Sequence, residues 1–154
     1  MRPTYAAGFR GFLFSTFLNL HIPIPMPIEL INAPDLPVPA GHYSHATRAG
    51  NLVCVSGQLP MRPDGTHTGD LPFEQQAQQA LDNVSTVLAA AGAGLKDVIE
   101  VTVYLVGVDH WKTFNEIYAR HFGDWKPARA VVPVGALHYG YLLEIAARAW
   151  VEPA

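Results

Sequence analysis

The chain has 154 residues, which is enough for one domain with a sizeable hydrophobic core. Hydrophobic residues make up 49% of it and charged residues 15%, with a net charge of −3. A main role in binding nucleic acid is therefore not expected, because phosphate neutralisation supplies most of that affinity. The single cysteine, Cys54, excludes an intrachain disulfide and favours a reducing, cytoplasmic location, and no apolar run is long enough to span a bilayer.

Residues 1–27 differ from the rest and form an N-terminal extension, which leaves one expected domain over residues 28–154. Arg2 and Arg10 precede an apolar run, and prolines follow that run. A basic start before an apolar run resembles a targeting segment, but no small-x-small cleavage site follows. A poorly ordered extension, or a true start at Met26, is the preferred interpretation.

Three short strands are expected next. The first is residues 28–31, and the other two, residues 43–47 and 52–56, flank a turn at Ala49–Gly50–Asn51. Residues 61–69 contain proline, aspartate and glycine, which is typical of a loop.

Residues 71–91 form the strongest predicted helix, because apolar side chains recur there at helical spacing. Asp70 and Pro72 suit the start of this helix, and Gly92 suits its end. The apolar side is expected to pack on a sheet.

A strand and a second helix follow. Residues 97–106 alternate, so that Ile99, Val101, Val103 and Leu105 are expected on one face of the strand. The second helix is expected over residues 110–122, with Asp109 as its cap. Its apolar stripe is Trp111, Phe114, Ile117, Tyr118 and Phe122.

The last two strands each carry one ionisable residue, Arg129 on the first and Glu144 on the second. A charge in a strand core is unfavourable unless it is paired or used. Strands joined by a short connection can lie side by side, so the two charges could meet at one place. Arg129 would then grip a carboxylate and Glu144 would activate water. The alternative is a structural Arg–Glu pair, or two charges at a sheet edge.

The order of elements predicts an α+β domain whose mixed sheet has two helices packed on one face.

Other catalytic and metal-binding signals are weak. Ser56 lies in VSGQ, outside a Gly-x-Ser-x-Gly elbow, and Cys54 is expected to be a buried core thiol. His42 and His45 would point to opposite faces of an alternating strand, which does not suit a shared metal. From the residues alone, the simplest interpretation is structural: Tyr43 is a residue at the end of a strand, and Asn115 is an exposed residue of a helix.

Four stretches match one family in order: GHYSHA, VCVSGQLP, QALDNVSTVLAAAG, and PARAVVPV followed by LLEIAA. From about residue 31 to residue 151 the chain resembles the Rid (YjgF-like) proteins, the reactive intermediate/imine deaminases. FNEIYARHF is also similar to the second helix of that family. The resemblance implies a chorismate-mutase-like fold and a homotrimer in which the sheets line an internal barrel and the sites lie between subunits.

The resemblance also implies roles for individual residues. Arg129 matches the arginine that grips the substrate carboxylate, and Glu144 matches the residue that positions or activates water. The remaining positions are expected to line the substrate pocket: Tyr43, Ser56, Gly57, Asn115 and Val131. The archetype has a cysteine where this chain has Val131, whose backbone N–H remains available to a ligand. The VGALHYGY connection also differs from that of the archetype. These two differences bear on the substrate range more than on the fold.

The function that the resemblance implies is hydrolysis of 2-imino or enamine acids, such as 2-iminobutanoate and 2-iminopropanoate, to 2-keto acids and ammonia. No metal or organic cofactor, nucleic acid or membrane is expected as a partner. Two alternatives remain. One is a trimer that binds or senses a small keto-acid-like molecule with little catalysis. The other is a ribonuclease or translation inhibitor, an activity ascribed to some relatives.

Overall fold

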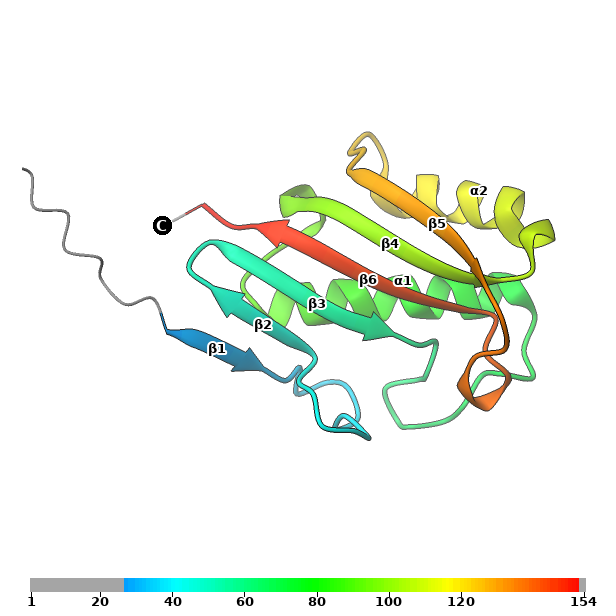
Figure 1. Cartoon of the computed structure of the whole chain (residues 1–154), viewed down its shortest axis with the longest axis horizontal. Coiled ribbons are helices and arrows are strands. Elements are labelled where there is room, and N and C mark those ends of the chain that lie inside the picture. The colour runs from blue at the N-terminus through cyan, green and yellow to red at the C-terminus, as the bar shows by residue number, and fades with distance from the viewer. Residues whose placement is uncertain (1–26, 153–154) are drawn as a thin grey trace, which may run out of the picture.

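Six strands form one sheet in the computed structural model, which describes residues 27–152 (Figure 1). The strand order is β1-β2-β3-β6-β4-β5. All neighbours are antiparallel except β4 and β5, which are parallel. The elements are β1 (Ile28–Ile31), β2 (Ala46–Ala49), β3 (Leu52–Gln58), α1 (Phe73–Ala90), β4 (Val98–Val106), α2 (Trp111–Phe122), β5 (Ala128–Val134) and β6 (Leu143–Trp150).

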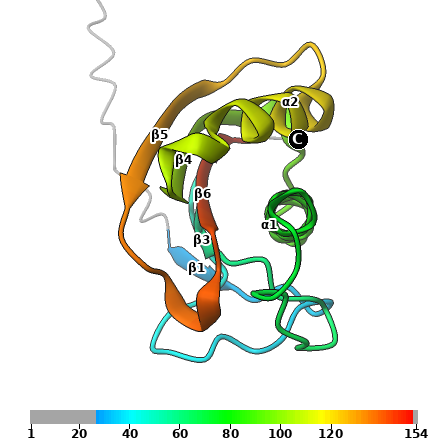
Figure 2. The same ribbon diagram turned by 90° about the vertical axis from the view of Figure 1, so that its right-hand side faces the viewer.

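Both helices lie on the same side of the curved sheet, as the end-on view shows (Figure 2). The core lies between them and the sheet, where Leu81, Phe114 and Ile145 are fully buried. Gly92 and Gly123, both with positive φ, follow the ends of the helices, a conformation that glycine adopts without strain. The predicted α+β architecture, with two helices on one face of a mixed sheet, is confirmed.

The last two strands are not neighbours, so this part of the sequence interpretation is wrong. β4 lies between β5 and β6, parallel to the first and antiparallel to the second. The short connection carries the chain across β4 through a 3₁₀ turn, η3 (His138–Gly140). Alternating hydrophobicity predicts which residues form a strand and not which strand lies beside it.

β4 begins with a bulge that alters the predicted face pattern. Val98 pairs with Ala149 and Glu100 with Arg148, so Ile99 is the extra residue in the ladder. As a result Val98 is buried and Ile99 is 45% exposed, contrary to the prediction for Ile99.

Two further expectations need correction. Cys54 is partly exposed and lies on the helix-free face of the sheet, because the buried positions of β3 are its neighbours Val53 and Val55. Residues 43–45 precede β2 and do not form a strand, since the backbone N–H of His45 donates to Asn32 Oδ1. The interpretation of residues 1–26 concerns positions outside the described part of the chain.

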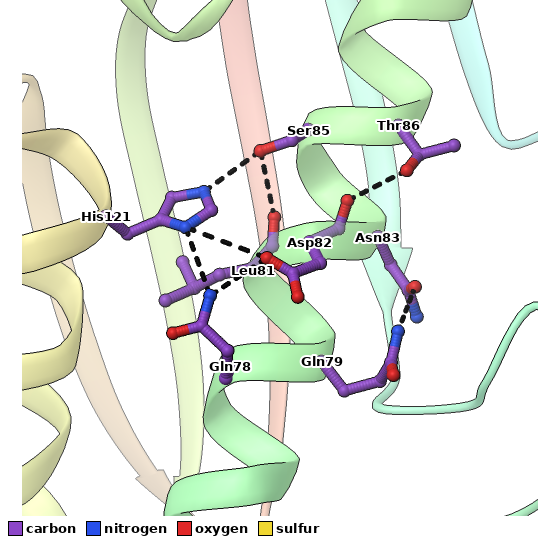
Figure 3. A network of polar contacts seen from close by, with 8 residues as sticks. All are labelled: Gln78, Gln79, Leu81, Asp82, Asn83, Ser85, Thr86 and His121. Carbon is purple, nitrogen blue, oxygen red and sulfur yellow. Dashed lines mark hydrogen bonds and ion pairs between the residues drawn. The ribbon is translucent and has the colours of Figure 1, made fainter.

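Polar side chains join α1 to α2 at one point of their packing surface (Figure 3). Ser85 Oγ lies 2.9 Å from His121 Nε2, and it also donates to the carbonyl oxygen of Leu81. Asp82 Oδ1 lies 3.9 Å from His121 Nδ1. Burial lowers the pKa of His121, and Asp82 partly opposes this effect. The contact therefore holds a neutral imidazole between the two helices.

Candidate active site

The predicted site residues form two groups in one chain. We call Tyr43, Ser56, Gly57 and Glu144 the glutamate half-site, and Asn115, Arg129 and Val131 the arginine half-site.

The glutamate half-site is built where β3 ends beside β6. The register between these strands shifts between Val55 and Gln58, and Gly57 lies in that irregular segment. A Cβ atom on Gly57 would overlap Oε1 of Glu144, so any other residue here would displace the carboxyl group from its present position. Ser56 uses its hydroxyl group within the chain, because Oγ donates to the carbonyl oxygen of Ser44 at 2.7 Å.

Burial raises the pKa of Glu144, while the nearby His138 opposes this shift. Within residues 27–152 the Glu144 carboxyl forms no ion pair. A carboxyl group with a raised pKa accepts and returns protons at a pH closer to neutrality than an ordinary glutamate does.

Tyr43 and Gly57 line one cavity of about 340 Å³, together with residues 36–41, Leu59, Met61, His138 and Tyr139. Asn83 of α1 fixes one wall, because its Nδ2 donates to the carbonyl oxygens of Leu59 and Met61 at 2.9 and 2.8 Å. This buried asparagine therefore holds the chain after β3 in place.

The arginine half-site lies between β5 and α2. Nη2 of Arg129 donates to Asn115 Oδ1 at 2.9 Å, and Cζ of Arg129 lies 4.5 Å from the centre of the Tyr118 ring. No carboxylate among the described residues pairs with Arg129. Lys126, which lines the same cavity, adds a second positive charge. This half-site is suited to an anion.

Tyr118 lies beneath the guanidinium group. Burial raises the pKa of Tyr118 to about 12, with Arg129 opposing the shift, so the phenol stays neutral. Its hydroxyl group is buried and has no hydrogen-bond partner within residues 27–152. Val131 lies two residues further along β5 and packs partly buried against the core.

The two half-sites lie on opposite faces of the sheet in one chain. Arg129 aligns with Val101 of β4 and contacts α2, whereas Glu144 aligns with Tyr104 of the same strand. Val101 and Tyr104 are three positions apart, and side chains alternate between faces at each position. One chain therefore does not bring Arg129 and Glu144 together.

The model of the family described as endoribonuclease L-PSP matches residues 33–151, which is most of the described chain. The chain belongs to this family, the YjgF/Rid family. A RutC family protein of Pyrococcus horikoshii is 42% identical over 127 residues, covering 80% of this chain and 98% of that protein. The chloroplastic Reactive Intermediate Deaminase A of Arabidopsis thaliana is 36% identical over 117 residues, covering 76% of this chain and 63% of that protein. The family thus includes a reactive intermediate deaminase.

A crystal structure of E. coli TdcF with bound serine is similar to this chain. It superimposes on this chain with a TM-score of 0.76 at 30% identity, covering 80% of this chain and 99% of TdcF. The YjgF-like fold that the sequence predicts is therefore confirmed.

Sequence reasoning from the Rid pattern missed Asn83, His138 and Tyr139. Asn83 itself occupies a buried position of α1. A polar residue on the buried face of a helix needs hydrogen-bond partners, and this was the signal that could have identified it. His138 and Tyr139 lie in the connection that departs from the Rid archetype, so the pattern carried no information about them.

Two findings concern other kinds of partner. Within residues 27–152 there is no group of three or more His, Cys, Asp or Glu side chains placed to hold a metal ion. In the same part of the chain, no helix has the length and apolar character that a membrane crossing requires.

Proposed function

We propose that this protein hydrolyses reactive 2-imino acids to 2-keto acids and ammonia, at sites shared between subunits of a homotrimer. The observation that carries the proposal is the arginine half-site. Its guanidinium group is held by Asn115 and Tyr118 and has no carboxylate partner among the described residues. The name of the Arabidopsis relative and the serine bound to TdcF, itself an amino acid with a carboxylate, give further support.

The shared site follows from the placement of the two half-sites. Because Arg129 and Glu144 lie on opposite faces of one sheet, a site that uses both takes them from different chains. The helix-free face also exposes large apolar side chains, among them Val132 at 38% and Trp150 at 47%. A second copy that covers this face would bury them, as expected for an obligate oligomer.

The reaction needs few catalytic groups, because the imine carbon is already electrophilic. Arg129 binds the carboxylate of the substrate, with Asn115 fixing the guanidinium plane, and this orients the C=N bond. Glu144 of another subunit removes a proton from water as the water oxygen adds to the imine carbon. Glu144 gives this proton to nitrogen, which completes a carbinolamine. It then takes the proton of the new hydroxyl group and passes it to nitrogen as the C–N bond breaks, so that ammonia leaves and the 2-keto acid remains. An enamine substrate first takes a proton at carbon 3 and loses one from nitrogen, which gives the imine. Action in the cytoplasm remains a prediction from the single cysteine.

The test is a coupled assay in which a threonine dehydratase generates 2-iminobutanoate in the presence of semicarbazide, which traps the imine. Wild-type protein is expected to accelerate formation of the keto acid, and Arg129→Ala is not. Arg120→Ala is the matched control, because Arg120 is an exposed arginine of α2. Equal acceleration by Arg129→Ala would refute the role of the arginine. Saturable binding of a 2-keto acid by wild type without turnover would support the sensing alternative instead.

The ribonuclease alternative makes a different prediction. The chain has 10 lysines and arginines against 13 acidic residues, which gives little attraction for a polyphosphate backbone. Salt-sensitive cleavage of RNA by pure protein would favour that alternative.

A further inference from the structure

The cavity of the glutamate half-site is larger than the small imines 2-iminopropanoate and 2-iminobutanoate require. Its volume of about 340 Å³ lies within the range of ligand pockets, roughly 300–1,000 Å³. A liquid water molecule occupies about 30 Å³, so a methyl or ethyl side chain would leave most of this space filled with water. The cavity therefore has room for a larger group.

The surface that lines this cavity is more apolar than polar. Residues 36–41 include prolines, Leu36 and Val38, and Leu59 and Met61 face them from the segment after β3. Val38 is 87% exposed, which leaves apolar surface in water that a ligand would cover. Gly57 also lines this cavity, and the Glu144 carboxyl group lies directly against Gly57.

Tyr139 lines the cavity, and tertiary contacts hold its backbone in place. Its φ of 57° is unusual for a residue with a side chain. Its ring lies 4.2 Å from the ring of His67, and a Cβ atom on Gly69 would overlap its carbonyl oxygen. Backbone in such a conformation persists where the surroundings impose it, and such positions cluster at ligand sites. The Tyr139 ring is nevertheless 60% exposed, so it remains available to a ligand.

We infer that this cavity receives the side chain of the imino acid, and that Met61 and Tyr139 select substrates whose side chains are large and apolar or aromatic. The inference rests on the proposed function, because it places the imine carbon beside Glu144 and the carboxylate at Arg129 of another subunit. The side chain then points between the proline-containing segment and Met61. Tyr139 covers the outer end of the bound group.

The test compares imines made in the assay by an L-amino acid oxidase from phenylalanine, leucine and alanine. For wild type, kcat/KM is expected to be at least about tenfold higher for the phenylalanine and leucine imines than for the alanine imine, since single methylenes in apolar pockets already change it by roughly tenfold. Met61→Trp, which fills the cavity, and Tyr139→Asn, which tolerates the positive φ, should each lower that ratio at least threefold. Trp111→Ala, at an exposed aromatic residue of α2, should leave the ratio unchanged.

The outcomes separate the inference from the proposed function. Hydrolysis of all imines with no preference, or with preference for the alanine imine, would overturn the inference and leave the proposed function standing. If no imine is hydrolysed, the proposed function fails, and binding of phenylpyruvate and pyruvate decides the inference by calorimetry. Tighter binding of phenylpyruvate that Met61→Trp weakens would support the pocket, and equal binding would overturn it.

Discussion

Mixing two inactive variants tests whether each site takes residues from two chains. Arg129→Ala lacks the arginine half-site and Glu144→Gln lacks the glutamate half-site. In one chain these residues are separated by β4 and by three ladder positions. With strands about 4.8 Å apart and a rise of about 3.3 Å per residue, their Cα atoms are about 14 Å apart, with side chains on opposite faces.

The expected recovery follows from counting interfaces. A wild-type site needs arginine from a Glu144→Gln chain and glutamate from a neighbouring Arg129→Ala chain. In a random equal mixture this combination occurs at about one quarter of interfaces. Under the proposed function, Arg129→Ala alone would lose two charge-assisted hydrogen bonds to the carboxylate, each about 1.5–3 kcal/mol. That lowers kcat/KM by roughly 10² to 10⁴. The recovered activity therefore stands well above the background.

The assay is imine hydrolysis after the two variants are unfolded together and refolded, with native mass spectrometry to confirm mixed oligomers. About a quarter of the wild-type rate is expected from the mixture, and almost none from either variant refolded alone. The matched control mixes Arg129→Ala with Glu116→Gln, an exposed glutamate of α2. Every glutamate half-site is then intact, so about half of the interfaces carry both residues and about half of the wild-type rate is expected. No recovery in verified mixed oligomers would refute the shared site.

Three further predictions concern single positions. Glu144→Gln should raise the free energy of unfolding near neutral pH, because the raised pKa of Glu144 makes the folded protein lose stability as pH rises from 4.5 through the folded pKa. Urea unfolding should show no such gain below about pH 4. A gain there would contradict the assigned cause. Gly57→Ala should lower imine hydrolysis at least about tenfold by displacing the Glu144 carboxyl, whereas Gly135→Ala, where a Cβ meets nothing within 4 Å, should retain wild-type activity. Burial lowers the pKa of His121 from 6.5, so the folded protein loses stability as pH falls below that value. His121→Gln should therefore flatten the decline of Tm between about pH 7.5 and pH 5.5. An unchanged slope would show that His121 does not cause the decline.

The sequence carried most of the information about local structure. The apolar spacing of residues 71–91 predicted α1, because a buried helical face recurs with the helical period. The alternation in β4 was readable except at Ile99, where a bulge shifts the ladder by one residue. A bulge depends on the partner strand, which local periodicity does not describe.

The geometry of the site was less accessible. Arg129 and Glu144 were identified as candidates because charges in apolar strands are unfavourable. The short connection allowed the two strands to be neighbours, which is wrong, since strand order depends on packing of the whole sheet. Tyr139 was missed because its positive φ and its contact with His67 arise only after distant segments meet.

The division of the site between opposite faces of the sheet makes activity, under the proposed function, a matter of mass action. A newly synthesised chain can fold with each half-site complete and still lack a working site until it meets another copy. Dilution below the dissociation constant of the oligomer would then silence the enzyme without unfolding it. The amount of chain in the cell would set both the number of sites and the fraction of them that exist.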